Sequence, residues 1–214
     1  MEYDGEPWVR RLRDGVIPGR RALAVVLPVV VAVGIALTVL GLLHPHVVGE
    51  LLRSRSGFLA VLVPPGLIVT GPVVALMTLV RGRSDRRVLG RLRGGARPAF
   101  HIPVRTRTEV AADDLPPPRP VIWTVDADGL HGWAPRSSTP VLDLPWEDID
   151  RIDAATVWYR GTRREYGIWI GAGDGHVVLA PRAELGRPFA ASQYRIDVVM
   201  RILRSLRRQF RPPT

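Results

Sequence analysis

Two long runs without a charged residue constrain this chain more than any other feature. The first run, ALAVVLPVVVAVGIALTVLGLL, spans residues 22–43, and the second, GFLAVLVPPGLIVTGPVVALMTLV, spans residues 57–80. A helix of about 20 apolar residues crosses the roughly 30 Å hydrocarbon core of a bilayer. A buried helix of a soluble protein is the alternative, but two such runs flanked by Arg favour the membrane. We therefore predict two transmembrane helices joined by a short external loop, residues 44–56.

A cleaved signal peptide is another explanation for the first run. The apolar core of a signal peptide is about 7–15 residues long and precedes a small-residue cleavage site. This run is longer, no A-x-A site follows it, and several acidic residues precede it. We interpret it as a retained transmembrane span.

The distribution of arginine predicts the orientation of the two spans. All 30 basic residues are Arg: five precede the first run, two lie in the loop, and seven follow the second run up to residue 97. The positive-inside rule then places the N-terminal segment, residues 1–21, and the C-terminus in the cytoplasm. We therefore predict a multi-pass plasma-membrane protein. The arginines expected at the membrane surface are Arg81, Arg83, Arg86, Arg87, Arg91 and Arg93.

Composition narrows the possible partners and chemistry. The formal net charge of +10 would suggest nucleic acid, but arginines beside an anionic leaflet, worth about 1 kcal/mol each, account for it without a nucleic-acid partner. The absence of Cys excludes disulfides and thiolate metal sites. Neither run contains an ionisable residue, which argues against a pump or transporter. Gly34, Thr38 and Gly41 permit close helix contact, either inside the pair of helices or between copies in a homo-oligomer.

The segment after the second run, residues 81–119, is expected to be a basic juxtamembrane stretch followed by a Pro-rich linker. Its first part is predicted to form a short helix on the lipid headgroups, with Val88, Leu89 and Leu92 facing the bilayer. Within the linker, FHIPVRT has the composition of an edge strand.

From residue 120 the hydrophobic period changes to two, which predicts six or seven short antiparallel strands. The chain then returns to a helical period near its end. One apolar stripe at this spacing contains Ile196, Val199, Met200, Leu203, Leu206 and Phe210. We therefore predict a mainly β domain over residues 120–214, closed by an amphipathic helix.

The order of these pieces resembles a known family. TVDADGLHGW, LPWEDIDRID, an aromatic-rich strand pair, GDGHVVLAP and a final helix, over residues 117–210, are similar to the bacterial PH-like domain. Membrane proteins of the YcxB-like group combine two spans with such a domain. The resemblance implies a partly open β-barrel capped by the C-terminal helix, and it implies a fold more than an activity.

The acidic stretch LPWEDIDRID has two explanations. Paired carboxylates perform acid–base chemistry when a cleft raises a pKa, but the sequence supplies no second group for such a site. Trp146, Ile149 and Ile152 recur at three-residue spacing, so we interpret the stretch as a turn and strand with a buried apolar side and solvated acids. His44 and His46 in the loop have no adequate third metal ligand, so no metal or cofactor is expected.

The strongest candidate for a binding site is a basic loop containing Arg160, Arg163 and Arg164. Arg binds phosphate well because its guanidinium is a planar fork, but a solvated turn balanced by Glu165 explains the cluster too. No nucleophile–base pair or nucleotide-binding glycine motif is visible. We therefore expect a non-catalytic, membrane-anchored interaction or scaffold protein that binds a protein partner or anionic lipid. The alternative is an oligomeric accessory subunit of a transporter or channel.

Overall fold

The computed structural model describes residues 5–19, 21–46, 48, 53, 55–92, 98–105, 117–173 and 175–210. It divides the chain into two compact units. Gly19–Val80 forms one unit, called here the helical hairpin, and Met1–Pro18 together with Arg81–Thr214 forms the other, called the module. This division differs from the predicted boundaries, because the segments expected at 1–21 and 81–119 contribute to the same unit as the domain predicted from residue 120.

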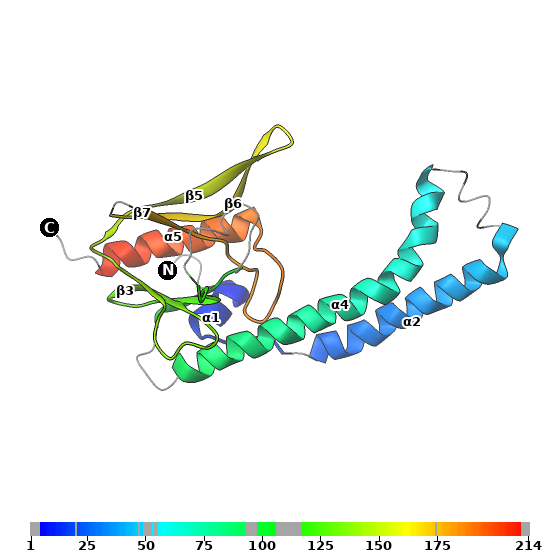
Figure 1. Ribbon diagram of the computed structural model, residues 1–214, viewed down its shortest axis with the longest axis horizontal. Coiled ribbons are helices and arrows are strands. Elements are labelled where there is room, and N and C mark those ends of the chain that lie inside the picture. Colours follow the sequence, from blue (N-terminus) through cyan, green and yellow to red (C-terminus); the bar gives the residue numbers. More distant parts are fainter. Residues whose placement is uncertain are drawn as a thin grey trace. The chain divides into compact units, whose positions relative to one another are not determined.

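The helical hairpin contains two apolar helices, α2 (Arg21–Leu43) and the larger part of α4 (Arg55–Leu92) (Figure 1). Within the described residues, one helical stretch, Val61–Leu92, is long and apolar enough to cross a membrane, and its most apolar window has a mean hydropathy of 1.9. Leu27–Leu43 is a shorter apolar helix. One potential span is therefore present in the structure, and the second remains a prediction.

Large apolar side chains of both helices point away from the protein. Leu42 is 76% exposed, Val25 66% and Leu76 61%. A soluble protein rarely exposes apolar surface on this scale, because its contact with water is unfavourable. The exposed surface of the hairpin is thus suited to contact with lipid.

Gly34 and Gly71 of the helical hairpin lie where its two helices meet. A Cβ atom added to Gly34 would come within 3.0 Å of the Pro64 carbonyl oxygen, and one added to Gly71 within 3.2 Å of Leu27 Cδ1. Thr38 donates its hydroxyl to the Gly34 carbonyl oxygen at 2.8 Å. The sequence allowed Gly34 to contact either the other helix of the same chain or a second copy in a homo-oligomer. In the structure Gly34 contacts the other helix of the same chain.

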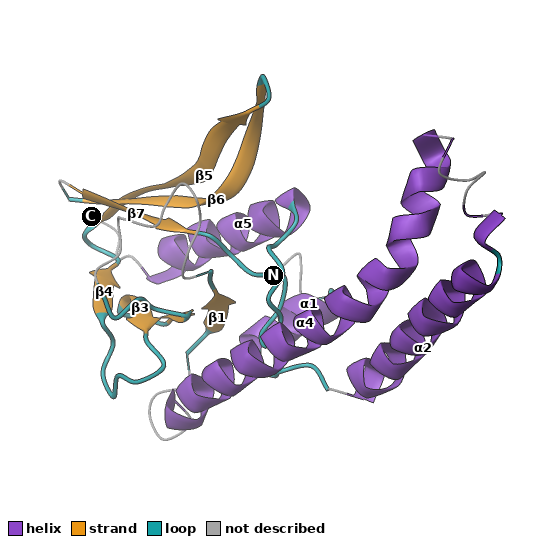
Figure 2. Ribbon diagram, turned by 45° about the vertical axis from the view of Figure 1, so that its right-hand side comes forward, coloured by secondary structure: helices purple, strands orange, loops and turns teal. Residues whose placement is uncertain are grey.

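The module contains two antiparallel sheets (Figure 2). The first has the order β1-β2-β3-β4, and the second the order β5-β6-β7. The strands of the first sheet are β1 (Phe100–Pro103), β2 (Ile122–Val125), β3 (Gly129–Trp133) and β4 (Leu142–Pro145). The strands of the second are β5 (Ile149–Tyr159), β6 (Thr162–Ala172) and β7 (Gly175–Leu179). From residue 120 onward the described part of the structure has six antiparallel strands, as the alternation of apolar and polar residues predicted, and FHIP forms the expected edge strand β1.

The C-terminal helix α5 (Gln193–Phe210) contacts β5 and β6 and shares one hydrophobic core with both sheets. Its predicted apolar stripe is confirmed from Ile196 to Leu206, whereas Phe210 is partly buried at the end of the helix. The sequence pattern missed Val198 and Ile202, which are also buried because the helix is covered on more than one side.

The N-terminal helix α1 (Pro7–Arg13) belongs to the same core. Its Trp8, Val9 and Leu12 are 7%, 1% and 2% exposed. Trp8 also lies under the guanidinium of Arg195, which is 5.0 Å from the ring centroid. Helix α1 is thus a structural part of the module, which the sequence did not predict.

The helix predicted to lie on the headgroups has a different role. Val88 and Leu89, expected to face the bilayer, are 2% and 5% exposed and belong to the core of the module. Leu92 is partly buried against the same core. That expectation was wrong, because the same apolar face packs into the hydrophobic core of the module. The helical period of this short segment does not show whether its apolar face meets lipid or a protein core.

A buried ion pair fixes this end of α4 to the strands. Arg182 donates to Asp85 Oδ1 at 2.8 Å, and the two side chains are 1% and 0% exposed. Asp85 Oδ2 accepts a hydrogen bond from the Gly186 backbone N–H at 2.6 Å. The remaining donors of Arg182 reach the carbonyl oxygens of Val104, Arg187 and Val121. Both charges are therefore compensated by several hydrogen bonds, as burial requires.

Replacement of Asp85 by Ala is expected to destabilise the module by about 3–5 kcal/mol, because it leaves the Arg182 charge buried without a counter-ion. Unfolding of the detergent-solubilised chain in urea, followed by tryptophan fluorescence, measures the change. The matched control is Asp153→Ala, which removes the partly exposed pair of Asp153 with Arg204 and should cost at most about 1 kcal/mol. Equal effects of the two substitutions would contradict this role for the buried pair.

Candidate functional site

The basic cluster predicted from the sequence lies at the end of a protruding β-hairpin. Residues 156–165 of β5 and β6 pair with each other, beyond the part of β6 that pairs with β7. Figures 1 and 2 show this end of the two strands extending away from α5 and the rest of the sheet. We call residues 157–164 the hairpin tip.

The turn at the tip follows from its two central residues. Arg160 and Gly161 have φ angles of 48° and 78°, and Tyr159 faces Thr162 across the turn. Positive φ at both central positions is the geometry of a tight turn that matches the twist of the flanking strands. Arg163 and Arg164 therefore lie in β6, and the prediction that they belong to a connecting loop was wrong; only Arg160 is in the turn.

An exposed tryptophan completes the tip and was missed in the sequence. Trp158 is 75% exposed, and its register partner on β6 is Arg163. Directly opposed residues point to the same face of a sheet, so the indole and the guanidinium share one surface. The Nε of Arg163 donates to Thr156 Oγ1 at 3.0 Å, which orients this arginine. The signal available in the sequence was an aromatic residue only two positions before the arginine cluster.

The tip is a site of uniform charge. Residues 157–164 contain three arginines and no acid, and Arg160, Arg163 and Arg164 are all exposed. Glu165, the residue expected to balance them, is partly buried and pairs in register with Thr156 at the base of the tip. From residue 121 to the end the chain has 13 Arg against 11 acidic residues, so the tip, with three Arg and no acid, is more positive than this part of the chain on average. Such a surface favours an anionic partner.

The arginines predicted at the membrane surface have different surroundings. Arg83, Arg86 and Arg87 are exposed on α4, and Arg81 is partly buried. Arg91 donates instead to the backbone carbonyls of Pro135 and Ser137 in the β3–β4 connection. Arg93 lies outside the described residues.

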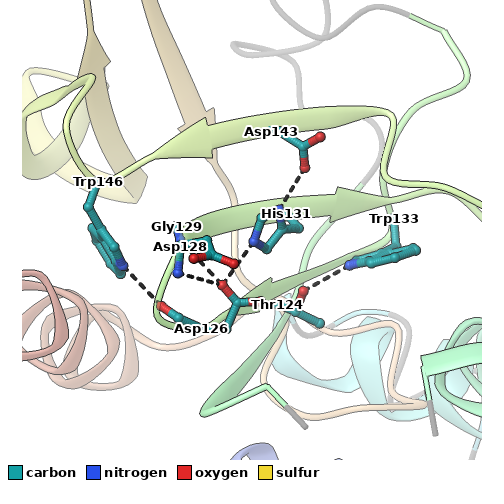
Figure 3. A network of polar contacts seen from close by, with 8 residues as sticks. All are labelled: Thr124, Asp126, Asp128, Gly129, His131, Trp133, Asp143 and Trp146. Atoms are coloured by element: carbon teal, nitrogen blue, oxygen red, sulfur yellow. Dashed lines mark hydrogen bonds and ion pairs between the residues drawn. The ribbon is translucent and has the colours of Figure 1, made fainter. Parts of the chain in front are cut away.

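A histidine held between two aspartates forms the main polar network of the first sheet (Figure 3). His131 on β3 contacts Asp143 Oδ1 of β4 through Nδ1 at 2.7 Å and Asp126 Oδ1 through Nε2 at 2.9 Å. The same oxygen of Asp126 accepts the backbone N–H of Asp128 at 3.0 Å, and the Asp126 carbonyl accepts the indole N–H of Trp146 at 3.0 Å. Both ring nitrogens of His131 are engaged, so this imidazole stabilises the β2–β3 turn and presents no free nitrogen to a substrate.

The acidic stretch LPWEDIDRID is connected to the same network through Trp146, and its side chains are divided between the core and the surface. Trp146, Ile149 and Ile152 are 3%, 0% and 4% exposed, which confirms their predicted place in the core. Glu147, Asp148 and Asp150 are exposed. Asp153 differs, because it is partly buried and accepts a hydrogen bond from Arg204 of α5 at 2.7 Å.

A second histidine lies beside a cavity. His101 on β1 is 7% exposed, and its Nδ1 is 2.9 Å from the Leu12 carbonyl oxygen of α1. The cavity beside it has a volume of about 810 Å³ and lies among residues of α1, α4, β1 and α5, including Leu89, Leu206 and Phe210. Residues 93–97 and 211–214, which adjoin its lining residues in the sequence, are outside the described part of the chain. No ligand is therefore assigned to it.

The other histidines that were considered as candidate site residues, His44, His46 and His176, contact aromatic rings. His44 and His46 contact each other edge to face, with ring centroids 6.0 Å apart. Glu50, the nearby acid in the predicted loop that could act as a third metal ligand, lies outside the described residues. His176 stacks on Trp169 at 5.7 Å. No group of three or more potential ligands with metal-binding geometry occurs among the residues that the structure describes.

His131 should make the module less stable as the pH rises. Burial disfavours the charged imidazole, but hydrogen bonds to Asp143 and Asp126 outweigh it and raise the pKa of His131. The contribution of His131 to the free energy of unfolding is therefore complete below about pH 6.5, which is its pKa in the unfolded chain. This contribution is lost as the pH rises through the higher pKa of the folded state. Urea unfolding at several pH values should show this loss in the wild type and not in His131→Gln. An unchanged pH profile in the variant would contradict the assignment.

His101 should have the opposite effect. Burial, which outweighs hydrogen bonding to the Leu12 and Arg13 carbonyls, lowers the pKa of His101. A lowered folded value means that the stabilising contribution is present above about pH 6.5 and is lost as the pH falls through the folded value. Titration of the ring by NMR should therefore give His101 the lower pKa of the two histidines, and the reverse order would contradict the contacts described.

Comparisons with family models, curated proteins and solved structures find no match to this chain. The likeness of residues 117–210 to PH-like domains therefore remains a prediction from the sequence.

Proposed function

We propose that the protein is a membrane-anchored, non-catalytic interaction protein. The helical hairpin crosses the plasma membrane twice, and the module lies in the cytoplasm. The hairpin tip then contacts an anionic partner, either an acidic protein surface or lipid headgroups. The observation that carries the proposal is Trp158, which is 75% exposed beside the uniformly positive arginines of the tip.

The shared core of the module supports two crossings. α1 precedes the helical hairpin and α5 follows it, yet Trp8, Val9 and Leu12 lie in the same hydrophobic core as Ile202 and Leu206. Parts of one core must be on the same side of a membrane. Residues 19–80 then cross an even number of times, so a span in α4 requires a second span in α2. The excess of Arg outside the loop favours the cytoplasm as the side of the module.

The order of strands supports the PH-like interpretation of the module. A four-stranded and a three-stranded antiparallel sheet follow each other in the chain, and a C-terminal helix contacts the second sheet. The resemblance implied antiparallel strands followed by a C-terminal helix, and this coarser order agrees with it. In such a fold the function depends on particular residues at the surface, since the fold alone does not specify an activity.

The hairpin tip has the chemistry of a contact surface. Large aromatic residues and arginines are enriched where protein surfaces bind partners, because they combine apolar area with directional polar groups. The guanidinium of Arg163 is oriented by Thr156, so less freedom is lost when it binds an anion. A tether to the bilayer raises the effective concentration of nearby partners, which makes a small contact surface sufficient.

Photo-crosslinking in native membranes tests the proposal. A benzoylphenylalanine at position 158 of the full chain should give a discrete adduct with a protein or with lipid. Charge reversal by Arg163→Glu and Arg164→Glu should reduce its yield about tenfold or more, since each arginine near an anionic surface is worth about 1 kcal/mol.

The matched control for charge is Arg136→Glu, a substitution at an exposed arginine in the β3–β4 connection. It should leave the adduct at position 158 unchanged. Absence of any adduct, or equal loss in the Arg136 variant, would count against the tip as the contact surface.

A further inference from the structure

We propose that the loop between β7 and α5, residues 183–191, is a membrane-interface anchor that inserts Phe189 into the headgroup region of the bilayer. The inference rests on the proposed function, because it requires that the helical hairpin spans the membrane. The partner is the lipid–water interface of that same bilayer. The surface is separate from the hairpin tip.

Phe189 is an exposed aromatic residue on an ordered loop. Its side chain is 53% exposed, whereas Leu185 in the same loop is 1% exposed. The Ala183 N–H donates to the Phe189 carbonyl oxygen at 2.9 Å, and Arg182 Nη1 donates to the Arg187 carbonyl oxygen at 3.0 Å. The loop thus presents Phe189 outward in a backbone conformation that its own hydrogen bonds maintain.

The buried ion pair fixes where this loop lies. Asp85 of α4 accepts the Gly186 N–H at 2.6 Å, which holds the loop against the helix. A Cβ atom added to Gly186 would meet Ile17 Cγ2 at 2.8 Å and Gly82 Cα at 3.7 Å. Figure 1 shows the loop, in orange, reaching α4. Gly186 therefore lies between the two chain segments that connect the module to the apolar helices.

Chain connectivity places those two segments close to the bilayer. Gly82 is two residues after Val80, the last residue of the second uncharged run, which is about 3 Å along a helix. Ile17 is four residues before Arg21, where α2 begins. The polar region on each side of the hydrocarbon core is roughly 5–8 Å thick. Residues beside Gly82 and Ile17 then lie at the depth of the headgroups.

The chemistry of the loop fits that depth. Aromatic residues concentrate at membrane–water interfaces, and arginine there attracts anionic headgroups. Phe189 follows Arg187 by two residues, and Arg83 is exposed on the neighbouring turn of α4. Val16, adjacent to Ile17, is a further apolar residue that is 47% exposed. A loop of this composition contacts lipid while the strands behind it remain in water.

Spin labelling tests the proposal directly, because the chain contains no Cys and single-cysteine variants carry one label. Phe189→Cys is labelled with a nitroxide in the full chain, reconstituted in vesicles of phosphatidylcholine and phosphatidylglycerol. Collision rates with oxygen, which partitions into lipid, and with a water-soluble nickel chelate report depth. Phe189 is exposed, so its replacement should not disturb the core.

Two matched variants separate this proposal from the proposed function. Leu76→Cys marks the lipid-facing surface of α4, where Leu76 is 61% exposed. Ser138→Cys marks water, because Ser138 is exposed. The preceding residue, Ser137, accepts a hydrogen bond from Arg91. Arg91 lies about 16 Å along α4 from Val80. We expect the oxygen-to-nickel ratio at position 189 to exceed that at 138 several-fold and to be below that at 76.

A water-like ratio at position 189 together with a lipid-like ratio at 76 would overturn the anchor and leave the proposed function intact. A water-like ratio at position 76 would overturn both. Equal ratios at positions 189 and 138 in all vesicle compositions would likewise exclude insertion of the loop.

Discussion

The buried pair of Asp85 and Arg182 is the interaction on which the rest of the module depends. It joins α4 to the strands, and the same carboxylate holds the loop that contains Gly186. Burial of two charges is unfavourable unless their hydrogen-bonding groups find partners, and here Arg182 also donates to the carbonyl oxygens of Val104, Val121 and Arg187. The pair therefore fixes the position of α4 relative to the segments that contain Val104, Val121 and Gly186. A purely apolar contact is not directional and would not fix these positions.

A second constraint comes from the core that α1 and α5 share. Because Trp8 and Leu12 share one hydrophobic core with residues of the C-terminal helix, α1 and α5 lie on the same side of any membrane that the chain crosses. The shared core does not depend on the hydropathy of α2, and it agrees with the orientation that the distribution of arginine favours. The shared core and the distribution of arginine are therefore both compatible with the proposed pair of spans.

Much of the module was predictable because its signals are local. The alternation of apolar and polar residues predicted the strands. The helical spacing of apolar residues predicted most of the buried face of α5, including Ile196 and Leu203. Asp85 was not predictable, because it lies in a basic segment and its partner is 97 residues away. At the candidate site the arginines were visible as a charge cluster. Trp158 was missed because alternation alone does not tell where a strand leaves the core.

The central claim is that the module and the N-terminal helix lie on the cytoplasmic side, with the end of the helical hairpin outside. The most direct measurement is labelling of single-cysteine variants in intact cells with a membrane-impermeant maleimide. The account predicts that His46→Cys is labelled in intact cells and that Ser138→Cys is labelled only after lysis. Labelling of Ser138→Cys in intact cells, or protection of His46→Cys until lysis, would contradict it.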